Sequence, residues 1–151
     1  MLADLHLLDP VDVGLGELGR HEGYIERQLR RWQRQWEDSK TRELPAIDEV
    51  HDLLNANVPP QQRVSIVHGD YRLDNVVSGF DAKVAAVLDW ELCTLGDPLA
   101  DLGAVLISWV EDGEDGSYHF GGTPTALPGF PTRAELTERY GARSGLDLTH
   151  V

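Results

Sequence analysis

Apolar residues in the first third of the chain recur at the spacing of an α-helix. Within residues 21–42 they step by four, three and four positions, at Ile25, Leu29, Trp32 and Trp36. This stripe predicts a long amphipathic helix over 21–42 whose apolar side needs a partner surface. Residues 46–58 predict a second helix, which ends before two prolines. The opening residues 1–8 are typical of the end of a helix.

After residue 60 the pattern changes to short β-branched runs. Val64–Val67 predicts one strand, and Asn75–Ser78 and Val84–Leu88 predict the two strands of a hairpin with its turn in between. Asp89 follows the second strand directly. In such a hairpin Asn75 and Asp89 both lie toward the open end, so we expect their side chains to converge.

Two more helices are predicted in the second half of the chain. The first has Asp97 as its N-cap and Pro98 at its first helical position, and the last covers residues 132–145. Residues 111–131 between them predict a loop. The chain of 151 residues, 41% of them hydrophobic, suits a single α+β domain whose core needs neither disulfide nor metal.

Composition narrows the classes of partner. The chain has 13 Lys plus Arg against 26 Asp plus Glu, a net charge of −13, which disfavours nucleic acid or an anionic membrane as the main partner. Cys93 is the single cysteine, so one chain offers neither a disulfide framework nor a thiolate zinc site. No apolar run approaches the roughly 18 residues of a membrane span, and the start lacks the order of a signal peptide. We therefore expect a cytoplasmic protein.

A dense polar cluster interrupts this pattern between two β-branched pairs. The segment "HGDYRLDN", residues 68–75, follows Ile66-Val67 and precedes Val76-Val77. Because burying unpaired polar groups is costly, we expect this segment to form a loop that packed strands hold in place.

The spacing of Asp70, Asn75 and Asp89 indicates the chemistry. It provides one unencumbered carboxylate base and two hard oxygen ligands. Magnesium accepts few protein oxygens and fills its other positions with water and phosphate. The layout is typical of phosphoryl transfer, in which an aspartate accepts the proton of the attacking hydroxyl and metal ions neutralise the phosphates.

Two motifs in sequence carry a family resemblance. "HGDYRLDN" followed by "VLDWELCTLGDPLADLG" resembles the catalytic core of the aminoglycoside phosphotransferase and choline kinase-like family. It is most similar to the phosphotransferase domain of acyl-CoA dehydrogenase family 10 and 11 proteins, over roughly residues 1–110. The resemblance implies the mostly helical C-terminal lobe of a protein-kinase-like fold, with a small β-hairpin carrying the catalytic site.

The resemblance also implies roles for individual residues. Asp70 would be the catalytic base, and Asn75 and Asp89 would hold Mg²⁺ with bound ATP, or GTP, as phosphate donor. Arg72 stands where protein kinases place a phosphate-contacting lysine, so it is a second candidate catalytic residue. Asp101 would brace the catalytic loop through backbone amides.

Each of these residues has a simpler structural interpretation. Asp70 could be a turn carboxylate, Asn75 could cap a turn, and Asp89 could bond backbone amides at a strand end. We expect His68 to be structural, with its ring packed behind the loop. Eight carboxylates between Asp89 and Asp115 form either solvated surface or an acidic wall that attracts magnesium or a cationic substrate. Aromatic side chains could line a substrate pocket (Trp109, Tyr118, His119 and Phe120), although we expect Trp109, which the pattern places on a helix, to belong to the core.

The function that these features favour is ATP-dependent phosphorylation of a small-molecule hydroxyl. Residues 1–151 contain no glycine-rich nucleotide hairpin or strand lysine, so we interpret them as an incomplete C-lobe and expect weak or undetectable turnover alone. The alternative is a catalytically silent binding or assembly module, with self-association through surfaces that the other lobe would cover. A metal-dependent phosphoesterase is disfavoured because the histidines show no spaced pair.

Overall fold

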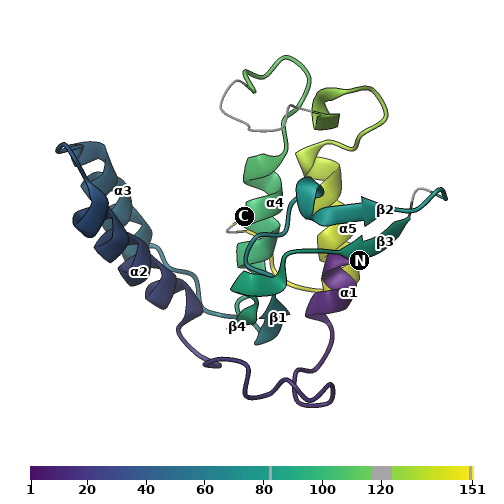
Figure 1. Cartoon of the computed structure of the whole chain (residues 1–151), viewed down its shortest axis with the longest axis horizontal. Coiled ribbons are helices and arrows are strands. Elements are labelled where there is room, and N and C mark those ends of the chain that lie inside the picture. Colours follow the sequence, from purple (N-terminus) through teal and green to yellow (C-terminus); the bar gives the residue numbers. More distant parts are fainter. Residues whose placement is uncertain (82, 117–123, 150) are drawn as a thin grey trace.

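The computed structural model describes residues 1–81, 83–116, 124–149 and 151 (Figure 1). The α-helices are α1 (Leu2–His6), α2 (Tyr24–Ser39), α3 (Pro45–Ala56), α4 (Leu99–Ser108) and α5 (Arg133–Ser144). The strands are β1 (Ser65–Val67), β2 (Val76–Ser78), β3 (Val84–Val87) and β4 (Thr94–Gly96). Single turns of 3₁₀ helix occur at η1 (Leu73–Asn75), η2 (Trp90–Leu92) and η3 (Pro124–Ala126). Among the described residues, no helix is both long and apolar enough to cross a membrane.

Helices α1, α4 and α5 and the two small sheets form the body of the molecule (Figure 1). One buried cluster joins the three helices through Ala3, Leu102 and Tyr140, and leucines of α1, α4 and the segment after α5 surround it. The α+β class predicted from the sequence is thus confirmed.

Strands β1 and β4 form an antiparallel pair in which Ser65 lies opposite Gly96. The sequence predicted β1 but not β4, because Thr94–Gly96 lacks the β-branched run that precedes the polar loop in β1. All of β1 is buried, and Leu95 of β4 is fully buried as well. Gly96 is required at the end of β4, since a Cβ atom there would lie 2.4 Å from the Tyr24 ring. This contact attaches the start of α2 to the body.

Strands β2 and β3 form the predicted hairpin, with Val76 opposite Val87. Its strands are one residue shorter at one end than the predicted ranges 75–78 and 84–88. The backbone N–H of Leu88 still donates to the carbonyl of Asn75 at 2.8 Å, so pairing continues to the open end.

Helices α2 and α3 form a helical arm that extends away from the body (Figure 1). The predicted start of α2 at residue 21 is wrong, because Gly23 adopts a left-handed conformation (φ 62°) and the helix begins after it. Helix α2 contacts α3, but Trp32 of the predicted apolar stripe remains 58% exposed. No residue of α3 is buried.

The predicted N-cap of α4 is wrong by one residue. Pro98 is the N-cap, and Asp97 precedes it. The carboxylate of Asp97 still accepts a hydrogen bond from the N–H of Leu99 at 2.9 Å, which satisfies one of the free amides of the first turn. Helix α5 begins with a capping box between Thr132 and Glu135.

Candidate active site

The polar loop, residues 68–75, leaves the buried strand β1 through a sharp turn at Gly69. Gly69 has φ 88°, and a Cβ atom there would lie 2.8 Å from the carbonyl oxygen of Leu92. Glycine is therefore required on two grounds, conformation and space. The close approach brings the polar loop against the segment that follows Asp89.

His68 holds the polar loop from behind. It is fully buried, its Nε2 lies 2.8 Å from the carbonyl oxygen of Leu88, and its Nδ1 accepts from the N–H of Asp70 at 3.2 Å. Its ring also packs against Trp90, with centroids 4.7 Å apart. Because Nδ1 accepts, Nε2 carries the proton and donates it to Leu88. The geometry agrees with the structural role predicted for His68.

Asp70 and Asn75 lie together. The Asn75 side-chain nitrogen donates to the backbone oxygen of Asp70 at 2.8 Å and to its carboxylate Oδ2 at 3.1 Å. Both partners are acceptors, so the amide nitrogen must face Asp70 and the amide oxygen must face elsewhere. This orientation leaves Asn75 Oδ1 available to a ligand and Asp70 Oδ1 without a partner among the described residues.

Asp89 lies at the end of β3, where η2 begins. With φ 64° and ψ 58°, it is the single non-glycine residue of positive φ in the described parts of the chain. Aspartate tolerates this conformation better than most residues, and such strain concentrates at functional sites. The preceding residue, Leu88, bonds both Asn75 and His68. The fold therefore brings the backbones of Asp89, Asn75 and the polar loop to one place.

Arg72 lies on the exposed side of the polar loop. Its Nε is 3.4 Å from Asp70 Oδ2, and its Nη1 is 3.6 Å from Asp74. These side chains are partly solvent-exposed, so the pairs add little to stability. Arg72 thus places a cation beside the candidate base, while its contact with phosphate stays a prediction.

Asp101 braces the polar loop as the resemblance implied. Its carboxylate accepts from the backbone N–H of His68 at 2.7 Å and of Gly69 at 2.8 Å. The side chain is 1% exposed and lies in the first turn of α4. Charge-assisted bonds to backbone amides are strong when water is excluded, so α4 fixes the start of the polar loop.

The donor set of this site fits magnesium. Asn75 offers a free amide oxygen and Asp89 an exposed carboxylate, and the remaining positions of the ion would go to water and phosphate. Among the described residues no group of three or more His, Cys, Asp or Glu could hold an ion. A site built on one amide and one carboxylate is the sparse kind that magnesium accepts.

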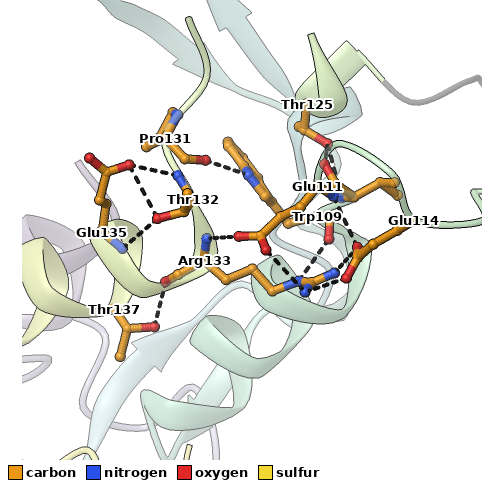
Figure 2. Close-up of polar contacts among 10 residues, drawn as sticks. Trp109, Glu111, Glu114, Thr125, Pro131, Thr132, Arg133, Glu135 and Thr137 are labelled. Carbon is orange, nitrogen blue, oxygen red and sulfur yellow. Dashed lines mark hydrogen bonds and ion pairs between the residues drawn. The ribbon is translucent and has the colours of Figure 1, made fainter. Parts of the chain in front are cut away.

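Four of the eight carboxylates of the acidic run are engaged within the fold. Asp97 and Asp101 are buried, and Glu111 and Glu114 bind Arg133 (Figure 2). The Arg133 side chain donates to Glu114 and to the carbonyl of Trp109, while its backbone N–H donates to Glu111 at 2.6 Å. Glu111 and Glu114 therefore connect the segment after α4 to the start of α5.

The aromatic residues predicted to line a pocket separate into two groups. Trp109 is buried, and its indole N–H donates to the carbonyl of Pro131 at 2.8 Å (Figure 2). It also lines a cavity of about 490 Å³ between the hairpin and helices α1, α4 and α5. That cavity includes Arg72 but neither Asp70, Asn75 nor Asp89. Tyr118, His119 and Phe120 lie outside the described residues.

Sequence reasoning missed the support behind Asp101. His6 is fully buried in α1, with its Nε2 3.1 Å from Asp101 Oδ2 and its Nδ1 2.7 Å from the hydroxyl of Tyr140. The contacts span 95 and 134 residues of sequence. No local pattern could reveal them.

Comparison with curated proteins gives relatives over most of the chain. Acyl-CoA dehydrogenase family member 11 of Rattus norvegicus is 36% identical over 148 residues, which is 97% of this chain and 19% of the relative. Family member 10 of Mus musculus is 42% identical over 103 residues, which is 68% of this chain and 10% of the relative. The chain thus spans at most about a fifth of the length of these relatives.

Solved structures share the fold. A candidate aminoglycoside phosphotransferase from Ralstonia eutropha is 38% identical, with a TM-score of 0.84 over 98% of this chain and 46% of that one. Macrolide 2'-phosphotransferase type I, 19% identical, has a TM-score of 0.68 over 97% of this chain and 42% of that one. The model of the phosphotransferase enzyme family matches residues 1–139. The chain therefore belongs to the phosphotransferase enzyme family.

Proposed function

We propose that this chain carries the catalytic base and the metal ligands of an ATP- and Mg²⁺-dependent phosphotransferase that acts on a hydroxyl group of a small molecule. The observation that carries this proposal is the orientation of Asn75. Its amide nitrogen is held by Asp70, which leaves its oxygen free for an ion, and the bond from the N–H of Leu88 to the backbone carbonyl of Asn75 keeps the next residue, Asp89, near it.

The chemistry assigned to Asp70 is proton acceptance. The substrate oxygen attacks the γ-phosphorus, the bond to the β-phosphate oxygen breaks, and the hydroxyl proton moves to the Asp70 carboxylate. ADP is the leaving group. The side chain of Asp70 is 38% exposed, and Oδ2 already accepts from Asn75, which leaves Oδ1 to receive the proton. Magnesium, when bound, supplies neutralisation of phosphate charge.

Arg72 is the candidate for stabilising the transferred group. Its guanidinium lies next to Asp70 and is partly solvent-exposed, so it can exchange its carboxylate partners for phosphate oxygens. Asn75 has a second task, since its bonds to Asp70 hold the base in one orientation.

Metal binding tests the ligand assignment directly. We expect calorimetric titration of the 151-residue chain with Mg²⁺ and ATP to show binding that Asn75→Ala and Asp89→Ala each weaken about tenfold or more. Asp74→Asn is the matched control, because Asp74 is an exposed carboxylate of the same loop that binds no described group except Arg72. Equal binding by all variants would favour the silent binding module.

Turnover tests the base. In a longer protein that contains this segment, Asp70→Asn should reduce ATP-dependent phosphorylation by roughly a thousandfold or more and leave the fold and metal binding intact. Asp74→Asn should keep most of the activity. An Asp70→Asn protein that retains full turnover would exclude Asp70 as the base.

A further inference from the structure

A buried chain of polar side chains runs from α5 to the polar loop. It starts at the Tyr140 hydroxyl on α5, passes through the His6 ring on α1, and ends at the Asp101 carboxylate on α4. The three side chains are 6%, 0% and 1% exposed, so solvent cannot substitute for any member. Asp101 in turn holds the backbone amides of His68 and Gly69.

Matching hydrogen-bond donors to acceptors assigns the protons on the Tyr140, His6 and Asp101 side chains. Burial and the nearby Asp101 charge raise the pKa of Tyr140, so its hydroxyl keeps its proton. The described residues offer that hydroxyl no acceptor except Nδ1 of His6. With Nδ1 accepting, Nε2 carries the ring proton and donates it to Asp101. Tyr140, by donating to Nδ1, and Asp101, by accepting from Nε2, therefore favour the same tautomer of His6.

The proton on His6 Nε2 provides one of the hydrogen bonds that hold the Asp101 carboxylate. Asp101 Oδ2 accepts from both the His6 ring and the N–H of His68, whereas Oδ1 accepts from Gly69. Three donors fix the rotation of the carboxylate. Without the donation from His6, the carboxylate could rotate and lengthen its bonds to the polar loop. The residue two positions beyond His68 is Asp70, so its placement depends on this rotation.

Helix α1 is held in place at the same point. The hydroxyl of Ser65 in β1 donates to the backbone oxygen of His6 at 2.9 Å. The His6 ring and the Tyr140 ring meet edge to face, with centroids 5.8 Å apart. The imidazole therefore has little freedom to turn away from Asp101.

We propose that Tyr140 and His6 are positioning residues, which make the geometry of the polar loop depend on how α5 packs against the body. The structural part of this proposal concerns residues 68 and 69. Its catalytic part, an effect on Asp70, rests on the proposed function.

Tyr140→Phe tests the proposal with little change in packing. In the 151-residue chain, we expect the ¹⁵N signal of His6 Nδ1 to shift because this nitrogen loses its hydrogen-bond donor, and amide hydrogen exchange at His68 and Gly69 to rise about tenfold. Tyr24→Phe is the matched control, because Tyr24 is also 6% exposed but its hydroxyl bonds no described residue. It should change neither signal.

A second variant separates positioning from stability. A general loss of stability would raise exchange throughout β1 and β4, whereas loss of positioning raises it at His68 and Gly69 alone. His6→Gln keeps an N–H donor near Asp101, and because a glutamine amide has no tautomers, this donor does not depend on Tyr140. Adding Tyr140→Phe to His6→Gln should therefore have little further effect on these amides.

The results distinguish the two proposals. Unchanged His6 spectra and unchanged exchange at His68 and Gly69 in Tyr140→Phe would overturn the positioning role, even if Asp70→Asn abolished turnover. Selective loosening of these amides would support it, even if the chain bound neither Mg²⁺ nor ATP. In an active longer protein, Tyr140→Phe should lower kcat several-fold with little change in KM.

Discussion

The body and the helical arm use charged residues in opposite ways. In the body, Asp101 is buried and each of its oxygens has a donor. In the arm, arginines and glutamates face solvent, and the ion pairs of Lys40 with Glu37 and Glu43 involve partly exposed side chains. A buried charge such as Asp101 has one defined set of partners, whereas the exposed charges of the arm can exchange partners freely.

This difference indicates where chemistry can be supported. A base and two metal ligands need positions fixed to within a fraction of an ångström, which only packed, fully bonded surroundings provide. Among the described residues, Arg63 Nη1 is the one buried side-chain nitrogen or oxygen atom without a hydrogen-bond partner. The arm has the opposite character, since Leu53 on α3 is 64% exposed and no α3 residue is buried.

The largest loss of stability is expected from removing the buried carboxylate of Asp101. Asp101→Ala would leave two backbone amides and the His6 ring buried without their acceptor, so we expect a loss of roughly 3–5 kcal/mol in the free energy of unfolding. Urea denaturation measures it. A loss below about 1 kcal/mol would show that the brace is less important than its geometry indicates.

A smaller and pH-dependent effect is expected from Asp97, the second buried carboxylate of this region. Burial raises its pKa above the usual value, so the folded state binds the proton more tightly than the unfolded state. Its contribution to stability is therefore greatest at low pH and declines as pH rises from about 4 through the raised value. Asp97→Asn keeps an acceptor for the N–H of Leu99 and removes this decline.

The measurement is the difference in unfolding free energy between wild type and Asp97→Asn, followed from pH 3 upward. We expect Asp97→Asn to gain stability relative to wild type with rising pH. A constant difference over this range would contradict a raised pKa at Asp97.

The smallest effect is expected in the arm. Leu53→Lys replaces an exposed apolar side chain with a charged one, so the free energy of unfolding should change by less than about 0.5 kcal/mol. Thermal denaturation of the 151-residue chain checks this. A loss above about 1 kcal/mol would mean that this side of α3 is covered in solution, and the contrast between arm and body would then be weaker.

The elements of the fold could be predicted where a local pattern was long enough to read. The stripe from Ile25 to Trp36 revealed α2, and the β-branched runs revealed β1 and the hairpin. Strand β4 could not be found, because Thr94–Gly96 becomes a strand only by pairing with β1. The boundary errors at Gly23 and Pro98 arose from backbone conformations that composition does not specify.

The candidate site also combines contacts that are local in sequence with contacts between distant segments. Asp70 and Asn75 are five residues apart, so one loop suffices to join them, and a motif can represent it. The roles of His6 and Tyr140 depend on helices that meet from opposite ends of the chain. The motif therefore indicated the local contact between Asp70 and Asn75, whereas the contacts of His6 and Tyr140 arise only when distant helices pack together.

The contact between Trp90 and His68 gives the site an optical reporter. The indole centroid lies 4.7 Å from that of the imidazole with the two rings tilted by 57°, and Trp90 is partly open to solvent and directly follows Asp89. The other tryptophans are at positions 32, 36 and 109. With those three replaced by phenylalanine, fluorescence from a single indole would report directly on whatever occupies the neighbouring carboxylate.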